Sequence, residues 1–156
     1  MLRYTAEPKI IYPIIANECR FTLDTDGFLV NDKAFILPTS DLRVLGVLNS
    51  RLAYFYFSLV CAALEGESDR YLEFRAQYVD SFPLRSDVLG SDNKRLTSLV
   101  TTMLSLHSRL AAEQLPQRRE QIQREIDATD RQIDALVYQL YGLTDDEIKI
   151  VEEATR

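Results

Sequence analysis

The sequence predicts an α+β protein, with a small mixed β-sheet and a central helix first, then an antiparallel coiled-coil-like α-helical hairpin and a short C-terminal helix. Two observations support this prediction. Short apolar runs separated by turn signals fill residues 1–90, and from residue 91 the apolar residues recur with heptad spacing. We therefore expect an α/β domain over residues 1–90 and a helical domain over 91–156.

Extended segments are expected in the first domain. Residues 9–16 are rich in isoleucine, and Pro13 among them favours an edge position or a bulge because proline cannot donate a ladder hydrogen bond. Residues 19–24 and 28–37 should form the second and third strands. The polar residues 31–33 in the centre of the third suggest a kink or a second turn there. The stretch Asp24–Gly27 between them is a turn signal, in which the glycine can adopt positive φ.

A helical rhythm follows these strands. One of the polar residues 39–41 can cap the helix N-terminus. From Leu52 onward, apolar residues occur on all sides of the helix, which predicts a central helix covered on several sides. Residues 71–84 then return to alternation of apolar and polar side chains, which predicts extended structure.

Two heptad seams define the second domain, and their spacing of three and four residues is typical of helices that pack along one stripe. Pro116 fits the first turn of the second helix, and the short joint before it favours an antiparallel hairpin. Gly142 should end that helix, and Thr144 with Glu147 should form a capping box for a helix over 145–154. The seams are Leu96, Leu99, Met103, Leu106 and Leu110, then Ile122, Ile126, Thr129, Ile133, Leu136 and Leu140.

Composition narrows the class of protein. The chain has 156 residues, 46% hydrophobic and 27% charged, as expected for a packed core. No signal peptide is recognisable, and the longest apolar run, residues 52–64, is interrupted only by Ser58 and is shorter than the roughly 18 residues of a membrane span. Cys19 and Cys61 fit neither a zinc site nor a disulfide framework. We therefore expect a cytoplasmic protein with reduced thiols and no membrane contact.

The sequence offers no catalytic or metal-binding pattern. It contains no glycine-rich phosphate loop, nucleophile elbow or zinc-binding helix motif. His107 is the only histidine and lies beside a heptad seam, where we expect it at the surface rather than acting as a base. Carboxylate pairs occur in turns or at helix starts, where turn chemistry explains them. We expect no enzymatic activity of this chain alone, and no cofactor or metal bound to it.

Several stretches of the sequence resemble one family. Three of them, "KIIYPIIANECRFTLDTDGFLVNDKAFIL", "LRVLGVLNSRLAYFYFS" and "YLEFRAQYVDSFPL", are similar to the TaqI-like C-terminal specificity domain. That domain is the target-recognition part of type IIG restriction–modification enzymes and of adenine-specific DNA methyltransferases. The tail "IDATDRQIDALVYQLYGLTDDEIKIVEE" resembles the C-terminus of the same proteins, so the resemblance covers residues 8–156. One departure is "EGESDRY", which stands where the family often has a glycine-rich turn.

The resemblance implies a DNA target-recognition domain over residues 1–90, and a chain that recognises a DNA sequence without catalysis of its own. It would act on double-stranded DNA together with methyltransferase or nuclease domains, in cis or in trans. The methyltransferase signature Asn/Asp-Pro-Pro-Tyr/Phe is absent. S-adenosylmethionine and Mg²⁺ are therefore expected only in the catalytic parts. Whether the chain is a fragment or a separate subunit stays open.

The net charge of −6 argues against a broadly basic DNA-binding face, since residues 1–90 and 91–156 each carry 9 basic and 12 acidic residues. Reading base edges needs only a few polar side chains on loops and strand ends. The competing interpretation of each candidate DNA contact is a solvated surface residue or an internal ion pair, such as one between Arg75 and Asp80. The candidate DNA contacts are Lys9, Arg20, Asn31, Lys33, Arg70, Arg75, Gln77 and Tyr78.

A protein-interaction or assembly module is the alternative function. The helical hairpin would then be the docking element, and a homodimer could form through its heptad seams. The same seams fit packing against the first domain equally well, so the spacing alone does not distinguish the two.

Overall fold

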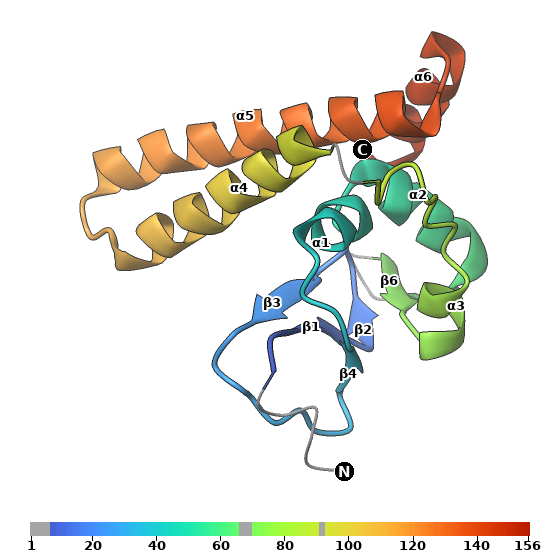
Figure 1. Ribbon diagram of the computed structural model, residues 1–156, viewed down its shortest axis with the longest axis horizontal. Coiled ribbons are helices and arrows are strands. Elements are labelled where there is room, and N and C mark those ends of the chain that lie inside the picture. The colour runs from blue at the N-terminus through green and yellow to red at the C-terminus, as the bar shows by residue number, and fades with distance from the viewer. Residues whose placement is uncertain (1–6, 66–69, 91–92) are drawn as a thin grey trace.

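The computed structural model describes residues 7–65, 70–90 and 93–156. It confirms the α+β class: two small antiparallel sheets lie below a long helical hairpin (Figure 1). The predicted single mixed sheet is therefore replaced by two sheets. The first has the order β3-β1-β4, formed by Thr22–Asp24, Lys9–Pro13 and Ala34–Leu37. The second has the order β2-β6-β5, formed by Ile15–Ala16, Arg70–Glu73 and Ala62–Glu65.

The predicted first strand is divided between the two sheets. The chain leaves β1 after Pro13 and enters β2 at Ile15, and the N–H of Ile14 between them donates to the Lys33 carbonyl at 3.0 Å. β1 is the middle strand of its sheet, so the strand as a whole does not lie at an edge. However, β3 pairs only with residues 9–11, which leaves Pro13 with β4 as its single neighbour. A residue without an N–H is tolerated at that point of the ladder.

The predicted single helix is two helices, α1 over Leu42–Leu48 and α2 over Arg51–Val60. The break falls at Ser50, whose hydroxyl accepts a hydrogen bond from the Ala53 N–H and so begins a new helix. Asp41, one of the residues predicted as a cap, accepts from the second residue of α1. The break redirects the chain, so that α2 runs from the hairpin toward the second sheet (Figure 1).

α2 contacts α1, α3, α5 and α6, and one face of it remains exposed. Ala53 and Phe57 are fully buried, whereas Leu59 is 69% exposed. The predicted helix covered on several sides is therefore found in α2, except for the exposed face that carries Leu59.

Two segments predicted as extended have other conformations. Residues 28–33 form a loop that contains the second turn expected within this run, at residues 32 and 33, and only residues 34–37 pair with β1. After β6 the chain turns into a short helix, α3, over Ala76–Asp80. Val79 and Phe82 are buried beyond the strand, at a spacing that fits a helical turn rather than an alternating strand.

The second half of the chain forms the predicted hairpin. α4 spans Lys94–Ala112, α5 spans Pro116–Tyr141, and α6 spans Asp145–Ala154. The predicted terminal signals are confirmed: proline begins α5, Gly142 caps it with a φ of 68°, and the capping box opens α6. In the described ranges, no helix combines the length and the apolar character that crossing a membrane requires.

The heptad seams pack against other parts of the same chain, and their side chains are buried or half-buried. Leu96 and Val100 of α4 and Ile133 and Val137 of α5 belong to the same hydrophobic core as α1, α2 and both sheets. The core therefore continues across residue 91, where we expected one domain to give way to the next. A smaller cluster closes the outer half of the hairpin and contains Leu106, Ile122 and Ile126.

Gly46 lies at a close approach of α1 to α4. A Cβ atom at Gly46 would lie 2.6 Å from Cγ2 of Val100 and 3.2 Å from Cδ1 of Leu96. Gly46→Ala should therefore lower the free energy of unfolding by about 1–3 kcal/mol, measured by urea denaturation. Adding Val100→Ala removes the obstructing methyl groups, so the double variant should lose less stability than the two single losses together. Strictly additive losses would contradict this packing.

Candidate nucleic-acid interface

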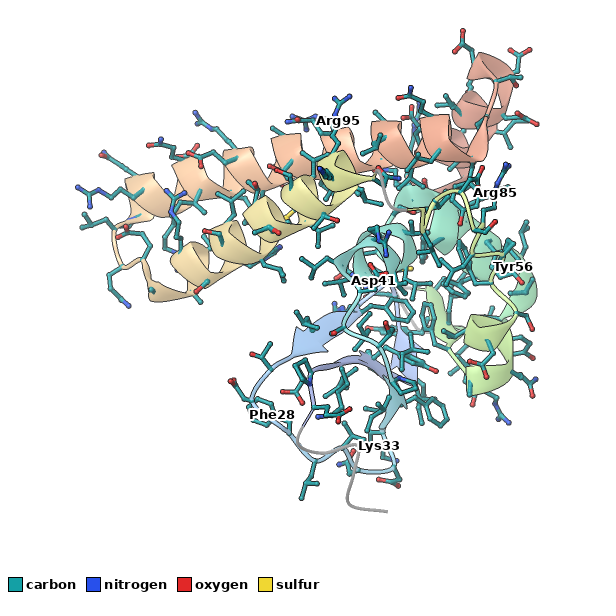
Figure 2. All side chains as sticks on the ribbon, in the orientation of Figure 1. Phe28, Lys33, Asp41, Tyr56, Arg85 and Arg95 are labelled. Atoms are coloured by element: carbon teal, nitrogen blue, oxygen red, sulfur yellow. The ribbon has the colours of Figure 1, made fainter. Side chains whose placement is uncertain are left out.

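The loop over residues 25–33 joins β3 to β4 at the end of the molecule away from the hairpin, where Figure 2 labels Phe28 and Lys33. Its tip exposes two large apolar side chains, with Phe28 at 64% and Leu29 at 78%. Asn31 and Lys33 follow, and both are exposed as well. The loop thus presents apolar and hydrogen-bonding groups side by side to solvent.

The carboxylate of Asp24 fixes the start of this loop. Its Oδ1 accepts hydrogen bonds from the N–H groups of Asp26 and Gly27 at 2.9 and 3.1 Å, and its Oδ2 accepts from the Phe28 N–H at 2.9 Å. Gly27 has a φ of 78°, as the turn signal predicted. The side chain of the last β3 residue therefore shapes the loop that follows it.

Lys9 lies beneath the loop instead of on the surface. Its side chain is 2% exposed, and its Nζ donates to Oδ2 of Asp24 at 2.5 Å. The hydrogen bond from Lys9, together with those from the backbone, outweighs burial and lowers the pKa of Asp24 below its usual value. In this structure Lys9, one of the predicted DNA contacts, supports the loop from inside.

A groove of about 350 Å³ runs over the first sheet next to the loop. Arg20, Asp26 and Phe28 contribute to its wall. The Arg20 side chain is exposed and is held by its neighbours: Nε donates to Glu18 at 2.9 Å and Nη2 donates to Asn17 at 3.3 Å. The structure thus places Arg20 on the groove that the loop borders. We call this groove, the loop 25–33 and Arg20 the loop face.

The other four predicted contacts lie elsewhere, on β6 and around α3, which is well separated from the loop in Figure 1. Arg70 is exposed and donates to the Ser58 carbonyl at 3.3 Å. Arg75 forms an ion pair at 2.9 Å with Glu73, not with Asp80.

Gln77 is exposed, and Tyr78 is half-buried against the core. The eight predicted contacts are thus divided between the loop face, the interior beneath it, and the β6–α3 side. Their contact with DNA stays a prediction.

Phe28 and Leu29 are the residues of the loop face that the sequence did not reveal. Their apolar character placed them in a predicted strand, and so in a core. The signal that could have identified them is the acidic turn before Phe28 and the polar Asn31–Lys33 stretch after it, since a short apolar run between two polar turns fits a loop tip as well as a strand.

In the part of the chain that the structure describes, no group of three or more His, Cys, Asp or Glu side chains is gathered as a metal site requires. His107 is exposed on α4, as expected. Cys19 and Cys61 are free thiols, and burial raises the pKa of Cys61 to about 11, which keeps it protonated at neutral pH.

One buried carboxylate lies at the junction of α5 and α2. Asp134 accepts a hydrogen bond from the Arg51 N–H at 2.8 Å, and the Arg51 guanidinium lies 3.6 Å from it. Burial, with the nearby charge of Asp130 adding to it, raises the pKa of Asp134 from 3.8 to about 6 in spite of these contacts. The ionised form is thus disfavoured in the folded protein.

Stability is therefore expected to rise as the pH falls from 7 to 5. A carboxyl group with a raised pKa binds its proton more tightly in the folded state, so its unfavourable contribution is largest above pH 6 and fades as the pH falls toward 3.8. For Asp134 the gain from pH 7 to 5 is about 1 kcal/mol. Urea denaturation at both pH values should show it, and Asp134→Asn should show a smaller change. An equal change in that variant would contradict the assignment.

Exposed loops held by a rigid scaffold are where binding residues of proteins are often found. Comparison with known families agrees: the model described as the TaqI-like C-terminal specificity domain matches residues 2–84, more than half of the chain. The chain belongs to this family. The matched region contains both sheets and the loop face, whereas residues 85–156 lie outside it, so their resemblance to the same proteins stays a prediction. No curated protein matches the chain.

Proposed function

We propose that the chain is the DNA sequence-recognition module of a type IIG restriction–modification enzyme or of an adenine-specific DNA methyltransferase. The single observation that supports this most is the family match, which covers the loop face and all eight predicted contact residues. A specificity domain selects the target and leaves the reaction to other parts of the enzyme. The catalytic parts would belong to the same chain or to a partner chain in the cytoplasm, and would hold S-adenosylmethionine and Mg²⁺.

The loop face is the contact surface that the geometry favours. Arg20 can donate to guanine O6 and N7, and Asn31 can pair with adenine N6 and N7. Lys33 is 82% exposed on the same loop and can reach either a base edge or a phosphate. On the β6–α3 side, Arg75 is paired with Glu73 just as Arg20 is paired with Glu18, so ion pairing does not distinguish the two sides. The loop face differs in that Arg20 and the loop line one groove.

The net charge of −6 restricts how such a module binds. Few phosphates can be neutralised by this chain, so the affinity of the chain alone should be modest and should decrease as salt increases. Base contacts then contribute a larger share of the binding free energy than in a strongly basic domain.

Selection from a random duplex library tests the proposal. The full chain, immobilised at ~50 mM salt, should enrich a common sequence. The double variant Arg20→Ala and Asn31→Ala should lose that enrichment. Arg124→Ala is the matched control, because Arg124 is an exposed hairpin residue paired with Glu120. Failure of the unmodified chain to enrich any sequence would contradict the proposal.

The assembly alternative gains no support from the hairpin seams. Leu96, Leu106 and Ile133 on these seams are buried within the same chain, so this stripe is already occupied.

A further inference from the structure

We infer that the loop tip reads an A·T base pair in the major groove: Phe28 and Leu29 contact the thymine 5-methyl group, and Asn31 pairs with the adenine. The inference rests on the proposed function and specifies one base pair of its target. One A·T pair offers both partners, because the thymine methyl group and the adenine N6 and N7 atoms lie on the same groove edge.

The first observation is the exposure of the tip. Leu29 is the most exposed large apolar side chain of the described residues, and Phe28 next to it is 64% exposed. Such a pair of side chains gains free energy when a partner covers it. In the major groove, the 5-methyl group of thymine is the apolar group that a protein can cover.

The second observation is that both ends of the loop are held in place. At its start, the Asp24 carboxylate binds the N–H groups of Asp26, Gly27 and Phe28. At its end, the Lys33 carbonyl accepts from the Ile14 N–H at 3.0 Å. A loop that is already ordered loses less conformational entropy when it binds, so its tip can contribute to affinity and specificity.

The third observation concerns Asn31 and the charge of the loop. Oδ1 of Asn31 accepts from the Lys33 N–H at 3.0 Å, which orients the amide and leaves Nδ2 and a second lone pair for adenine. The loop contains two acidic residues, Asp26 and Asp32, and one basic residue, Lys33. Its net charge is therefore negative, and phosphates repel it. Base edges suit it better, since adenine and cytosine present amino donors there.

The experiment compares thymine with deoxyuridine, which differs only by the methyl group. The full chain is used to select duplexes from two random libraries, one made with dTTP and one with dUTP. The affinity for the best dTTP-derived duplex should fall about fourfold when the critical thymine is replaced by deoxyuridine, as expected for one lost methyl contact. The double variant Phe28→Ser and Leu29→Ser should bind the two duplexes equally.

Leu59→Ser is the matched control, since Leu59 is 69% exposed but lies on α2, and this variant should keep the thymine preference. Two results would overturn the inference while leaving the proposed function intact: equal binding of both duplexes by the unmodified chain, or an unchanged preference in the double variant. The latter would assign the tip to another partner, such as a protein chain. No enrichment from either library would overturn the proposed function, and this inference with it.

Discussion

Replacing Asp24 with alanine is expected to leave the ammonium group of Lys9 buried without a partner and to lower the free energy of unfolding by about 3–5 kcal/mol. Lys9 is 2% exposed and donates to Asp24. The same substitution removes the acceptor for the N–H groups of Asp26, Gly27 and Phe28, so the loop should also lose its fixed shape. Urea denaturation at pH 7 measures the loss.

The reverse substitution should be milder. Lys9→Met leaves the Asp24 carboxylate with its backbone donors, so it should destabilise less than Asp24→Ala. The double variant Lys9→Met and Asp24→Ala leaves no buried charge at this site and should be more stable than Asp24→Ala alone. Because the pKa of Asp24 is lowered in the folded state, the contribution of this pair is present above pH 3.8 and is lost as the pH falls below it. A negligible effect of Asp24→Ala would contradict the role assigned to the pair.

Phe57→Ala is expected to lower the free energy of unfolding by about 3–5 kcal/mol, because it leaves a cavity where the sheets, α2 and α3 meet. Phe57 is fully buried, and its ring lies 5.3 Å from that of Phe74, 5.6 Å from Phe82 and 6.1 Å from Phe21. These rings come from segments far apart in the sequence, so the loss of the Phe57 ring should weaken the packing of all of these segments.

The control is Leu59→Ala on the same helix, which removes an exposed side chain and should change stability by less than about 0.5 kcal/mol. Since the core also includes Val137 of α5, the Phe57→Ala protein should still unfold in a single transition at a lower urea concentration. If the sheets unfolded in a transition during which the helical signal of the hairpin did not change, the helices and the sheets would be shown to unfold separately.

The sequence predicted the helical half of the fold well. Heptad spacing repeats over many turns, so the hairpin does not depend on any single residue, and Pro116, Gly142 and the capping box mark its ends locally. The strands are much shorter, and a few alternating residues fit a strand and a helical turn alike. That is why residues 76–80 were predicted as extended although they form α3.

The candidate site was also difficult to predict from local sequence patterns. Lys9 reads as a polar residue at a strand end, but the register pairs it with Asp24 across the sheet, and no local pattern reveals that register. Phe28 and Leu29 read as core residues, but the hydrogen bonds of Asp24 direct the chain outward before them. Arg20 was predicted separately from Asn31 and Lys33. The fold brings it to the loop that carries them, because Arg20 and Phe28 line the same groove.

Sequence-specific DNA binding by the full chain is the most direct test of this account. Fluorescence anisotropy should compare the selected duplex with a scrambled duplex of equal length and composition over a range of salt concentrations. We expect the affinity for both to fall as salt rises, with the selected duplex at least about tenfold tighter at each concentration. Equal affinities for the two duplexes at every salt concentration would contradict the claim that this chain recognises a DNA sequence.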